Sequence, residues 1–267
     1  MRYEYFKNGL IGQAAPYSTE FYFSEEEERF NLELQHQPED WVYRTKSIQY
    51  NLNSHGHRSI EIDELEDPYI LFTGCSHTEG HGLAIEDTYA CVVAQQLNMN
   101  YYNLAVKGSG IDTLYHNLLL FLNKVKVKPK LMVVQWPEIA RMALAYETHN
   151  VKRYDTYYPI KDHGYAYDYS VYEKLLMHQV PENQAAFYRQ LVLQHLEILQ
   201  IPTHQFFIGS RLAWHRLLTV NAYSTDFVFS NSTGAAKFLD YARDMDHAGI
   251  ETNKFWADSI VKHIKEK

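Results

Sequence analysis

Short apolar strands alternate with amphipathic helices through the middle of this chain, and this alternation restricts its fold more than any other feature. The run Tyr69–Phe72 is followed by Thr-Gly-Cys-Ser, which is typical of a buried strand ending in a turn. Further strands are predicted over 100–106, 131–135 and 204–208. Such an order pairs the strands in parallel and places helices on both faces. The sequence therefore predicts an α/β fold, a flavodoxin-like doubly wound, mostly parallel sheet.

Helices are predicted wherever apolar residues recur at helical spacing. The first is opened by Asp87 as its cap, and the second cannot continue past Pro129. Two more are predicted near 183–200 and 252–265. In a sheet of this kind ligands bind beyond the carboxyl ends of the strands, so functional residues are expected there.

The predicted core occupies only part of the chain. Residues 1–66 are polar and are predicted to form an N-terminal extension packed on the core, with short strands at most. Residues 67–267 are predicted to form the α/β domain. Within it, an insertion at about 142–182 is rich in Tyr, Asp and His, and its tyrosines could wall a cleft.

Composition excludes several classes of protein. The chain has 267 residues and is 46% hydrophobic, as expected of a folded chain. Its 25 Lys and Arg against 33 Asp and Glu give a net charge of -8, which argues against a nucleic-acid partner. No apolar run reaches the roughly 18–20 residues of a membrane span. The N-terminus lacks the apolar stretch of a signal peptide, and Cys75 and Cys91 are the only cysteines, so a cytoplasmic setting is expected.

One serine and one Asp-x-x-His pair stand where such a fold places chemistry. Ser76 follows the first predicted strand, and Asp244 and His247 precede the last helix. A serine becomes a nucleophile when a histidine, itself oriented by a carboxylate, takes its proton. Asp246 is an alternative to Asp244 as the orienting group, although it adjoins His247 and would point away from it in most turns.

Three blocks of sequence around these residues resemble the SGNH (GDSL-type) hydrolase family. Residues 69–83 resemble its first block, with Gly-Cys-Ser in place of Gly-Asp-Ser. Residues 103–108 resemble its second block, which ends in a glycine, and Asp244-x-x-His247 resembles its last. Upstream, Asn53–Arg58 resembles an Asn-x-x-Gly-aromatic-Arg segment found in some members. The resemblance covers about residues 50–140 and 240–265.

The resemblance implies a role for each matching residue. Ser76 would be the nucleophile, His247 the general base and Asp244 the orienting carboxylate. The backbone N–H groups of Ser76 and Gly108 would hold the oxyanion. Pro137 stands where the family has an asparagine that also donates to the oxyanion, and proline has no donor. Gln135 is the candidate substitute because its amide can donate.

Other readings of the same residues remain open. His77 and His81 have the spacing of helical metal ligands, but Gly80 and Gly82 disfavour a helix, so a wet loop lining the cleft is expected and no metal is predicted. His55 and His57 would share one face of a strand. Cys75 is expected to be a buried, inert thiol, and the short glycine pair at 108–110 is weak evidence for phosphate binding.

The function expected from the resemblance is a serine esterase that needs no cofactor. The substrate would be a small-molecule or glycan ester, and O-acylated carbohydrate fits the tyrosine-rich insertion. The alternative is a binding or structural protein that keeps the SGNH fold and has weak or no catalysis. Pro137 favours this alternative, whereas the presence of Ser76, Asp244 and His247 together favours the enzyme.

Overall fold

The centre of the computed structural model is a five-stranded parallel sheet in the order β11-β10-β7-β5-β6. The strands are β5 (Tyr69–Thr73), β6 (Asn100–Asn103), β7 (Leu131–Trp136), β10 (Thr203–Ile208) and β11 (Phe227–Phe229). In chain order the sheet runs 5-4-3-1-2, which is the flavodoxin-like arrangement. The predicted α/β, doubly wound fold is therefore confirmed. The structure describes residues 3–5, 10–13, 18–20, 34, 37–46, 48–137, 141–148, 151–157, 180–208, 227–229, 238–244 and 246–267.

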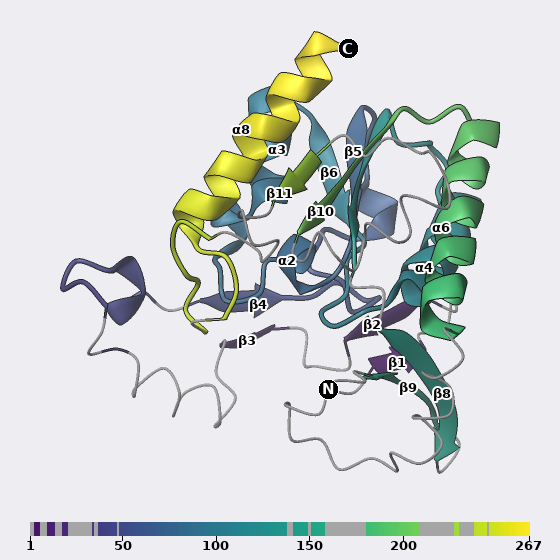
Figure 1. Cartoon of the computed structure of the whole chain (residues 1–267), viewed down its shortest axis with the longest axis horizontal. Coiled ribbons are helices and arrows are strands. Elements are labelled where there is room, and N and C mark those ends of the chain that lie inside the picture. Colours follow the sequence, from purple (N-terminus) through teal and green to yellow (C-terminus); the bar gives the residue numbers. More distant parts are fainter. Residues whose placement is uncertain are drawn as a thin grey trace.

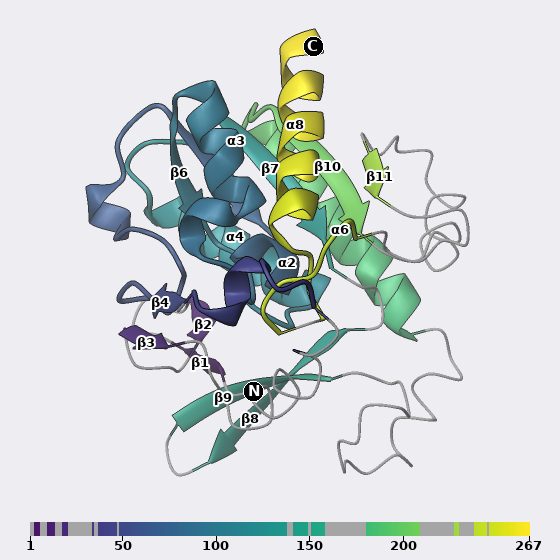
Figure 2. The ribbon, with the colours of Figure 1, turned by 90° about the vertical axis from the view of Figure 1, so that its left-hand side faces the viewer.

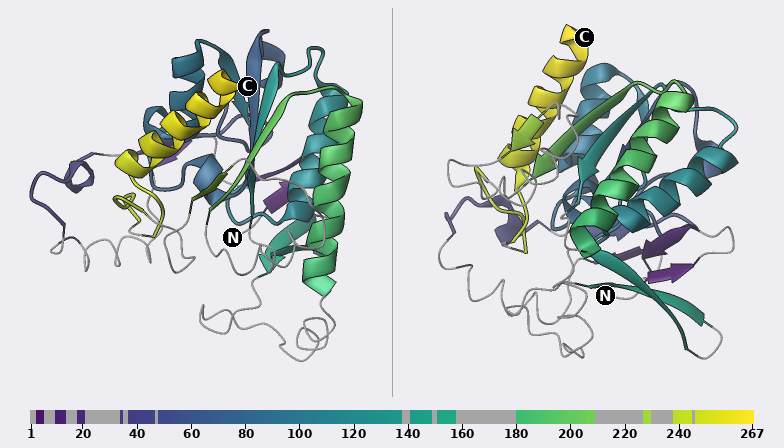
Figure 3. Two further views of the ribbon diagram at one scale, coloured as in Figure 1. Left: turned by 45° about the horizontal axis from the view of Figure 1, so that its top comes forward. Right: turned by 45° about the vertical axis from the view of Figure 1, so that its right-hand side comes forward.

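Helices cover both faces of the sheet, as Figures 1 and 3 show. On one face lie α3 (Tyr89–Leu97) and α8 (Ile250–Glu266), which pack against each other. On the other face lie α4 (Ile111–Lys124) and α6 (Val180–Ile198). The layers follow from the strand connections, because each crossover between parallel strands must pass over one face of the sheet.

Alternate residues of the buried strands fill two separate cores. In β5, Ile70 and Phe72 face the α3 and α8 layer, where Trp256 is fully buried. Leu71 faces the α4 and α6 layer, where Phe121 is fully buried. Burying one such side chain contributes about 1.5–3 kcal/mol, so the two cores fix the sheet and therefore the loops at its edge.

The helix and strand ends differ from the prediction in detail. Asp87 belongs to a 3-10 turn, Ile85–Asp87, and the cap of α3 is Thr88, whose hydroxyl accepts the Cys91 N–H. The prediction of an Asp87 cap is therefore wrong by one residue. The strand expected to end at Val106 ends at Asn103. α4 ends at Lys124, before Pro129, as expected.

The N-terminal strands and a hairpin from the expected insertion form a second sheet (Figure 2). Its order is β2-β1-β9-β8, with β1 antiparallel to both of its neighbours. The hairpin was not predicted, although only two residues separate its long strands. The strands of this sheet are β1 (Tyr3–Tyr5), β2 (Ile11–Gln13), β8 (Met142–Thr148) and β9 (Val151–Tyr157).

Short elements complete the described structure. β3 (Ser18–Glu20) pairs with β4 (Gln49–Asn51) in a two-stranded sheet. Two further 3-10 turns, Val42–Arg44 and Ile62–Glu64, lie in the same N-terminal part. Among the described helices, none combines the length and the apolar character needed to cross a membrane. The tyrosines expected to wall a cleft lie mostly within residues 158–179, outside the described part of the chain.

Candidate active site

The turn after β5 holds Ser76 at the start of the short helix α2 (Ser76–Glu79). Gly74 makes this turn possible, because a Cβ there would lie 2.1 Å from Thr78 Oγ1 and 2.6 Å from Gln135 Oε1. α2 ends at Gly80 in the left-handed conformation, with φ 82°. Ser76 itself is 4% exposed. The sequence Gly-Cys-Ser thus delivers one serine hydroxyl to the carboxyl end of a central strand.

The loop before α8 brings Asp244 and His247 to this serine. The His247 Nε2 atom lies 2.8 Å from Ser76 Oγ, and His247 Nδ1 lies 2.5 Å from Asp244 Oδ2. The other carboxylate oxygen, Oδ1, accepts the backbone N–H groups of His247 and Asp246. Asp246 is exposed. The structure therefore joins the three residues expected from the sequence in one hydrogen-bonded chain, with Asp244 and not Asp246 on the imidazole.

Close packing holds this loop against the nucleophile turn. The Arg243 N–H donates to Gly82 O at 3.1 Å, and the Arg243 guanidinium donates to Tyr43 O. A Cβ on Gly82 would lie 2.9 Å from the Cβ of Ala242 and 3.1 Å from Asp244 Oδ1. Gly82 also has φ 75°, so only glycine allows the loop to approach so closely. Figure 1 places α2 and the loop before α8 at the same end of the sheet.

The electrostatics of the site keep Asp244 ionised. Burial by itself would raise the pKa of Asp244, but the charge and hydrogen bond of His247, with the charge at His81, hold that pKa well below its usual range. Burial, and then the nearby charges of His247 and Arg141, lower the pKa of His77 well below the histidine value. Asp244 is therefore a carboxylate that can orient His247, and His77 is neutral.

Two backbone N–H groups are available near the serine. Ser76 N–H lies at the first turn of α2, and Gly108 has φ 74° in the loop after β6. Ser109 ties this loop to the nucleophile turn by donating to Gly74 O at 3.0 Å. Within the described part of the chain, neither N–H donates a hydrogen bond to another group of the protein. Both therefore stay candidates for the oxyanion role expected from the sequence.

Gln135 does not serve as the substitute donor that the sequence allowed. Its Oε1 atom accepts the Cys75 N–H at 3.0 Å, the Cys75 thiol at 3.2 Å and the Thr78 hydroxyl at 3.1 Å. Its Nε2 atom donates to Trp136 O at 2.7 Å. Three donors require the oxygen on that side, so the amide nitrogen faces away from them. The prediction for Gln135 is corrected: this side chain instead accepts hydrogen bonds from the turn that carries Ser76.

The end of β7 offers no side-chain donor in the described structure. Pro137 follows Trp136 and is buried, and it has neither an N–H nor a polar side chain. Residues 138–140 lie outside the described part of the chain. The departure from the family pattern seen in the sequence is therefore present in the site.

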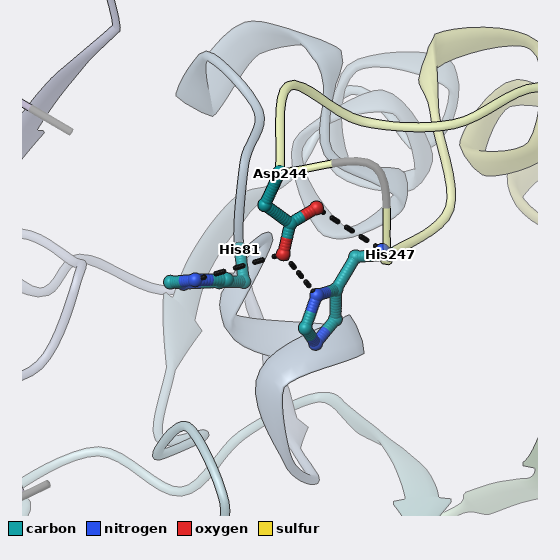
Figure 4. Close-up of side chains that lie close together, drawn as sticks. All are labelled: His81, Asp244 and His247. Atoms are coloured by element: carbon teal, nitrogen blue, oxygen red, sulfur yellow. Dashed lines mark hydrogen bonds and ion pairs between the residues drawn. The ribbon is translucent and has the colours of Figure 1, made fainter. Parts of the chain in front are cut away.

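His81 is the main residue whose setting the sequence did not reveal. It was expected in a wet loop, but it is 3% exposed and lies beside Asp244, with His81 Nε2 3.8 Å from Asp244 Oδ2 (Figure 4). Lys107 Nζ also contacts His81 Nε2. No sequence pattern indicates this contact, apart from the position of Lys107 next to Gly108.

His81, Asp244 and His247 are also the group that could hold a metal ion among the described residues, since their ligand atoms lie within 4.8 Å of one another. The Asp244–His247 contact of 2.5 Å is a hydrogen bond, and the Lys107 ammonium already contacts the His81 nitrogen. A second cation would have to displace both contacts. The geometry therefore fits a hydrogen-bonded acid–base chain better than a metal centre.

The remaining candidates have structural settings. Cys75 is buried and bonded to Gln135. His57 lies in a turn and not on a strand, where its ring bonds Tyr102 Oη and Ile11 O, and burial lowers its pKa to about 4. Arg58, from the same upstream segment, donates to the carbonyls of Gly80 and Leu83, both at 2.7 Å. This segment therefore braces the nucleophile turn.

Comparisons with known proteins find matches among solved structures. No protein-family model and no curated protein matches the chain. Among solved structures, the chain is similar to the esterase EstA from Pseudoalteromonas sp., with 10% identity, TM-score 0.48 and coverage of 75% of this chain and 98% of that one. A putative lipolytic protein of the G-D-S-L family from Desulfitobacterium hafniense has 10% identity, TM-score 0.49 and coverage of 74% and 99%.

The acetyl xylan esterase Est2A from Butyrivibrio proteoclasticus is a third neighbour, with 12% identity, TM-score 0.44 and coverage of 83% of this chain and 66% of that one. The neighbours thus include a protein of the G-D-S-L family, the family that the sequence blocks resemble. At these identities and TM-scores the likeness adds nothing on activity. The function therefore has to be argued from the geometry of Ser76, His247 and Asp244.

Proposed function

We propose that this protein is a serine hydrolase that cleaves acyl esters. The observation that carries the proposal is the chain of hydrogen bonds from Ser76 Oγ to His247 Nε2 at 2.8 Å, and from His247 Nδ1 to Asp244 Oδ2 at 2.5 Å. This is the geometry in which an imidazole takes the proton of a hydroxyl while a carboxylate stabilises the imidazolium that forms. The low pKa of Asp244 supports its role as that carboxylate.

The reaction proceeds through an acyl-enzyme. Ser76 Oγ attacks the ester carbonyl carbon while its proton passes to His247 Nε2. The tetrahedral intermediate collapses, and His247 gives the proton to the leaving alcohol. Water then attacks the acyl-enzyme, His247 takes one proton from that water, and the proton returns to Ser76 Oγ as the acid leaves. Atoms and charges balance without a cofactor.

The oxyanion is held by the N–H groups of Ser76 and Gly108 in this proposal. A single donor of this kind is worth about 2.7–4 kcal/mol in the transition state of other hydrolases. Because Pro137 supplies none and Gln135 is bonded elsewhere, we expect slow turnover on simple acetyl esters.

The finer proposal for the substrate is an O-acylated carbohydrate. Its support is the tyrosine-rich segment 154–172, since tyrosine faces suit sugar rings. Comparing hydrolysis of acetylated sugars with that of 4-nitrophenyl acetate tests this proposal. Equal kcat/KM on both would remove the preference for sugar.

A binding protein with the same fold and weak or no catalysis is the second candidate. Pro137, buried at the end of β7, favours it because the site then lacks one expected donor. The two candidates differ in whether Ser76 is reactive, which can be measured directly.

Labelling with a fluorophosphonate tests the proposal. We expect one phosphonyl group on Ser76, located by mass spectrometry of peptides, and no labelling in Ser76→Ala. Ser259→Ala, on α8, is the matched control and should label as the parent does. No labelling of the parent would favour the binding protein, and labelling at another residue would remove Ser76 from the proposed mechanism.

A further inference from the structure

A row of aromatic rings leads from His247 to the surface of the protein. The His247 ring contacts the His77 ring, with ring centroids 5.0 Å apart. His77 in turn contacts Phe238 at 5.6 Å between centroids, and Phe238 meets Tyr241 edge-on at 5.8 Å. Tyr241 is 47% exposed, and Leu239, which lies close to it in sequence, is 57% exposed. We refer to His77, Phe238 and Tyr241 as the aromatic row.

The inner part of the aromatic row is fixed by packing against α8. The Trp256 ring, which is fully buried, lies 5.9 Å from the His77 ring and 6.1 Å from the Phe238 ring between centroids. Burial, and then the nearby charges of His247 and Arg141, hold the pKa of His77 well below the ordinary histidine value. The inner rings of the row are therefore held in place and carry no charge.

The outer part of the row stands on a backbone that is held by hydrogen bonds. The Leu239 N–H donates to Thr252 Oγ1 at 2.8 Å, and Tyr241 forms an antiparallel bridge with Ala248. These contacts tie exposed apolar side chains to the start of α8 instead of leaving them on a free loop. Apolar side chains that stay exposed together on a fixed backbone are typical of binding surfaces.

Two rings that contact His247 differ in where they lead. His81 contacts the His247 ring with centroids 4.9 Å apart, but it is 3% exposed and so is covered by protein. His77 is partly exposed and continues into Phe238 and Tyr241. A molecule bound at His247 can therefore extend along the aromatic row, whereas the side toward His81 is closed.

The leaving alcohol has to lie beside His247. In the proposed reaction His247 Nε2 gives its proton to the oxygen of the leaving alcohol, so this oxygen must come within hydrogen-bond distance of Nε2. Nε2 lies 2.8 Å from Ser76 Oγ, the atom that stays bonded to the acyl group. The carbon of the alcohol therefore starts next to the His247 ring, where the aromatic row begins.

We propose that the aromatic row is a binding subsite for the alcohol part of the ester, and that it selects alcohols carrying a ring with an apolar face. This inference rests on the proposed hydrolase function and names the substrate class for that same site. A phenyl ring and a sugar ring share this chemistry, because each has a face that packs against an aromatic side chain.

The test compares esters that differ only in the alcohol. The kcat/KM of benzyl acetate divided by that of ethyl acetate should fall by about three- to tenfold in Tyr241→Ala, the loss expected for one aromatic contact. A ratio taken within one protein does not depend on the folded fraction, so it stays valid if the variant is less stable. Tyr241→Phe keeps the ring and should keep the parental ratio. Phe187→Ala, an exposed aromatic on α6, is the matched control and should also keep it.

Two further substrate pairs assign the part of the ester and the kind of ring. Ethyl butyrate against ethyl acetate changes the acyl part alone, and this ratio should be the same in the parent and in Tyr241→Ala. If Tyr241→Ala changes the acyl ratio and leaves the benzyl ratio unchanged, the row holds the acyl group and the inference is overturned. An acetylated methyl glucoside against ethyl acetate shows whether the selected ring includes sugars, because its ratio then falls in Tyr241→Ala as well.

Binding without catalysis separates this inference from the proposed function. In Ser76→Ala, millimolar benzyl alcohol should shift the NMR signals of the His77 ring protons in a saturable way, and adding Tyr241→Ala should weaken that binding. Saturable binding by a protein that shows no labelling of Ser76 would keep the subsite and refute the hydrolase. Hydrolysis at Ser76 with the same benzyl ratio in the parent and in Tyr241→Ala would overturn the subsite and keep the hydrolase.

Discussion

The two central strands of the sheet, β5 and β7, end beside each other but are followed by very different groups. They pair in parallel up to Thr73 and Val134, so their carboxyl ends lie at the same edge. β5 is followed by the turn that presents Ser76, and buried hydrogen bonds from Cys75 and Thr78 to Gln135 hold this turn in place. β7 is followed by Pro137, which presents no donor at all.

This difference shows that the sheet determines where the strand ends lie, whereas the residues after each strand determine which chemical groups are presented there. On the β5 side, Gly74, Gly80 and Gly82 allow close approach, and Gln135 reaches across from β7 to support the turn. On the β7 side, that same use of Gln135 turns its amide away from the oxyanion of the proposed hydrolase. In the proposed hydrolase the nucleophile half of the site is thus complete, whereas the electrophile-binding half would rely on backbone groups.

The largest expected effect on activity comes from removing a member of the hydrogen-bonded chain of Ser76, His247 and Asp244. His247→Ala should lower kcat/KM by roughly 10⁴–10⁶-fold, and Asp244→Ala by less, because water can partly replace the orienting carboxylate. Asp246→Ala, the matched control, should stay within a few-fold of the parent because Asp246 is exposed. Steady-state kinetics on 4-nitrophenyl acetate would measure all three. A larger loss in Asp246→Ala than in Asp244→Ala would contradict the observed pairing.

Activity should also fall as the solution becomes acidic, and one proton should account for the loss. Asp244 stays ionised through this range because its pKa is held well below the usual value, so protonation of this carboxylate is not expected to cause the loss. A protonated imidazole cannot accept the serine proton. A profile of kcat/KM against pH that falls with the slope of two protons would mean that a second group, such as Asp244, also titrates.

The next effect concerns the support that β7 gives to β5. Gln135→Ala would leave the Cys75 N–H and the Thr78 hydroxyl without their shared acceptor, and each orphaned buried donor costs about 1–3 kcal/mol. We expect the free energy of unfolding in urea to fall by about 2–5 kcal/mol. Gln95→Ala, exposed on α3, should change it by less than about 0.5 kcal/mol. A stable Gln135→Ala protein with a large loss of kcat and an unchanged KM would instead restore Gln135 as an oxyanion donor.

A smaller effect is expected where the upstream segment braces the nucleophile turn. Lys in place of Arg58 keeps the charge but cannot reach the carbonyls of Gly80 and Leu83 together. Arg58→Lys should therefore lower the free energy of unfolding by about 1–3 kcal/mol, the cost of one unsatisfied buried carbonyl. Arg44→Lys, which changes an arginine outside this turn, is the comparison. Equal losses in the two variants would argue against a special role for Arg58.

The sequence predicted the elements that have strong periodicity or a strong motif. The strand Tyr69–Phe72 is buried on both faces, and apolar runs of this length are typical of parallel central strands. Ser76, Asp244 and His247 could be singled out because each stands beside a strand or helix end that the periodicity locates. The cap of α3 was misplaced because Asp87 and Thr88 are adjacent and both can cap.

The parts that could not be predicted depend on contacts between distant residues. His81 looked solvated because two glycines flank it, yet Tyr50 and Arg58 bury it from another part of the chain. The direction of the Gln135 amide depends on Cys75 and Thr78, which lie about 60 residues away along the chain. The hairpin of β8 and β9 is completed by β1, which no local pattern could indicate.

The smallest expected effect is a gain in kcat. It tests directly the side of the proposed site that follows β7 and lacks a side-chain donor. Pro137 directly follows β7, next to the strand that delivers Ser76, so an amide side chain at this position would start close to the proposed oxyanion. Pro137→Asn should raise kcat about tenfold with KM within twofold. This is less than the 10²–10³-fold that a well-aimed donor supplies, since the surrounding loop is built for proline.

Pro137→Ala is the matched control, because it restores a backbone N–H and removes the constraint of the proline ring without adding a side-chain donor. A gain in asparagine alone means that the missing amide limits the rate, and an equal gain in both points to the backbone N–H. If both variants fold and neither is faster than the parent, a third donor already serves the oxyanion, and the contrast between the ends of β5 and β7 has no consequence for catalysis.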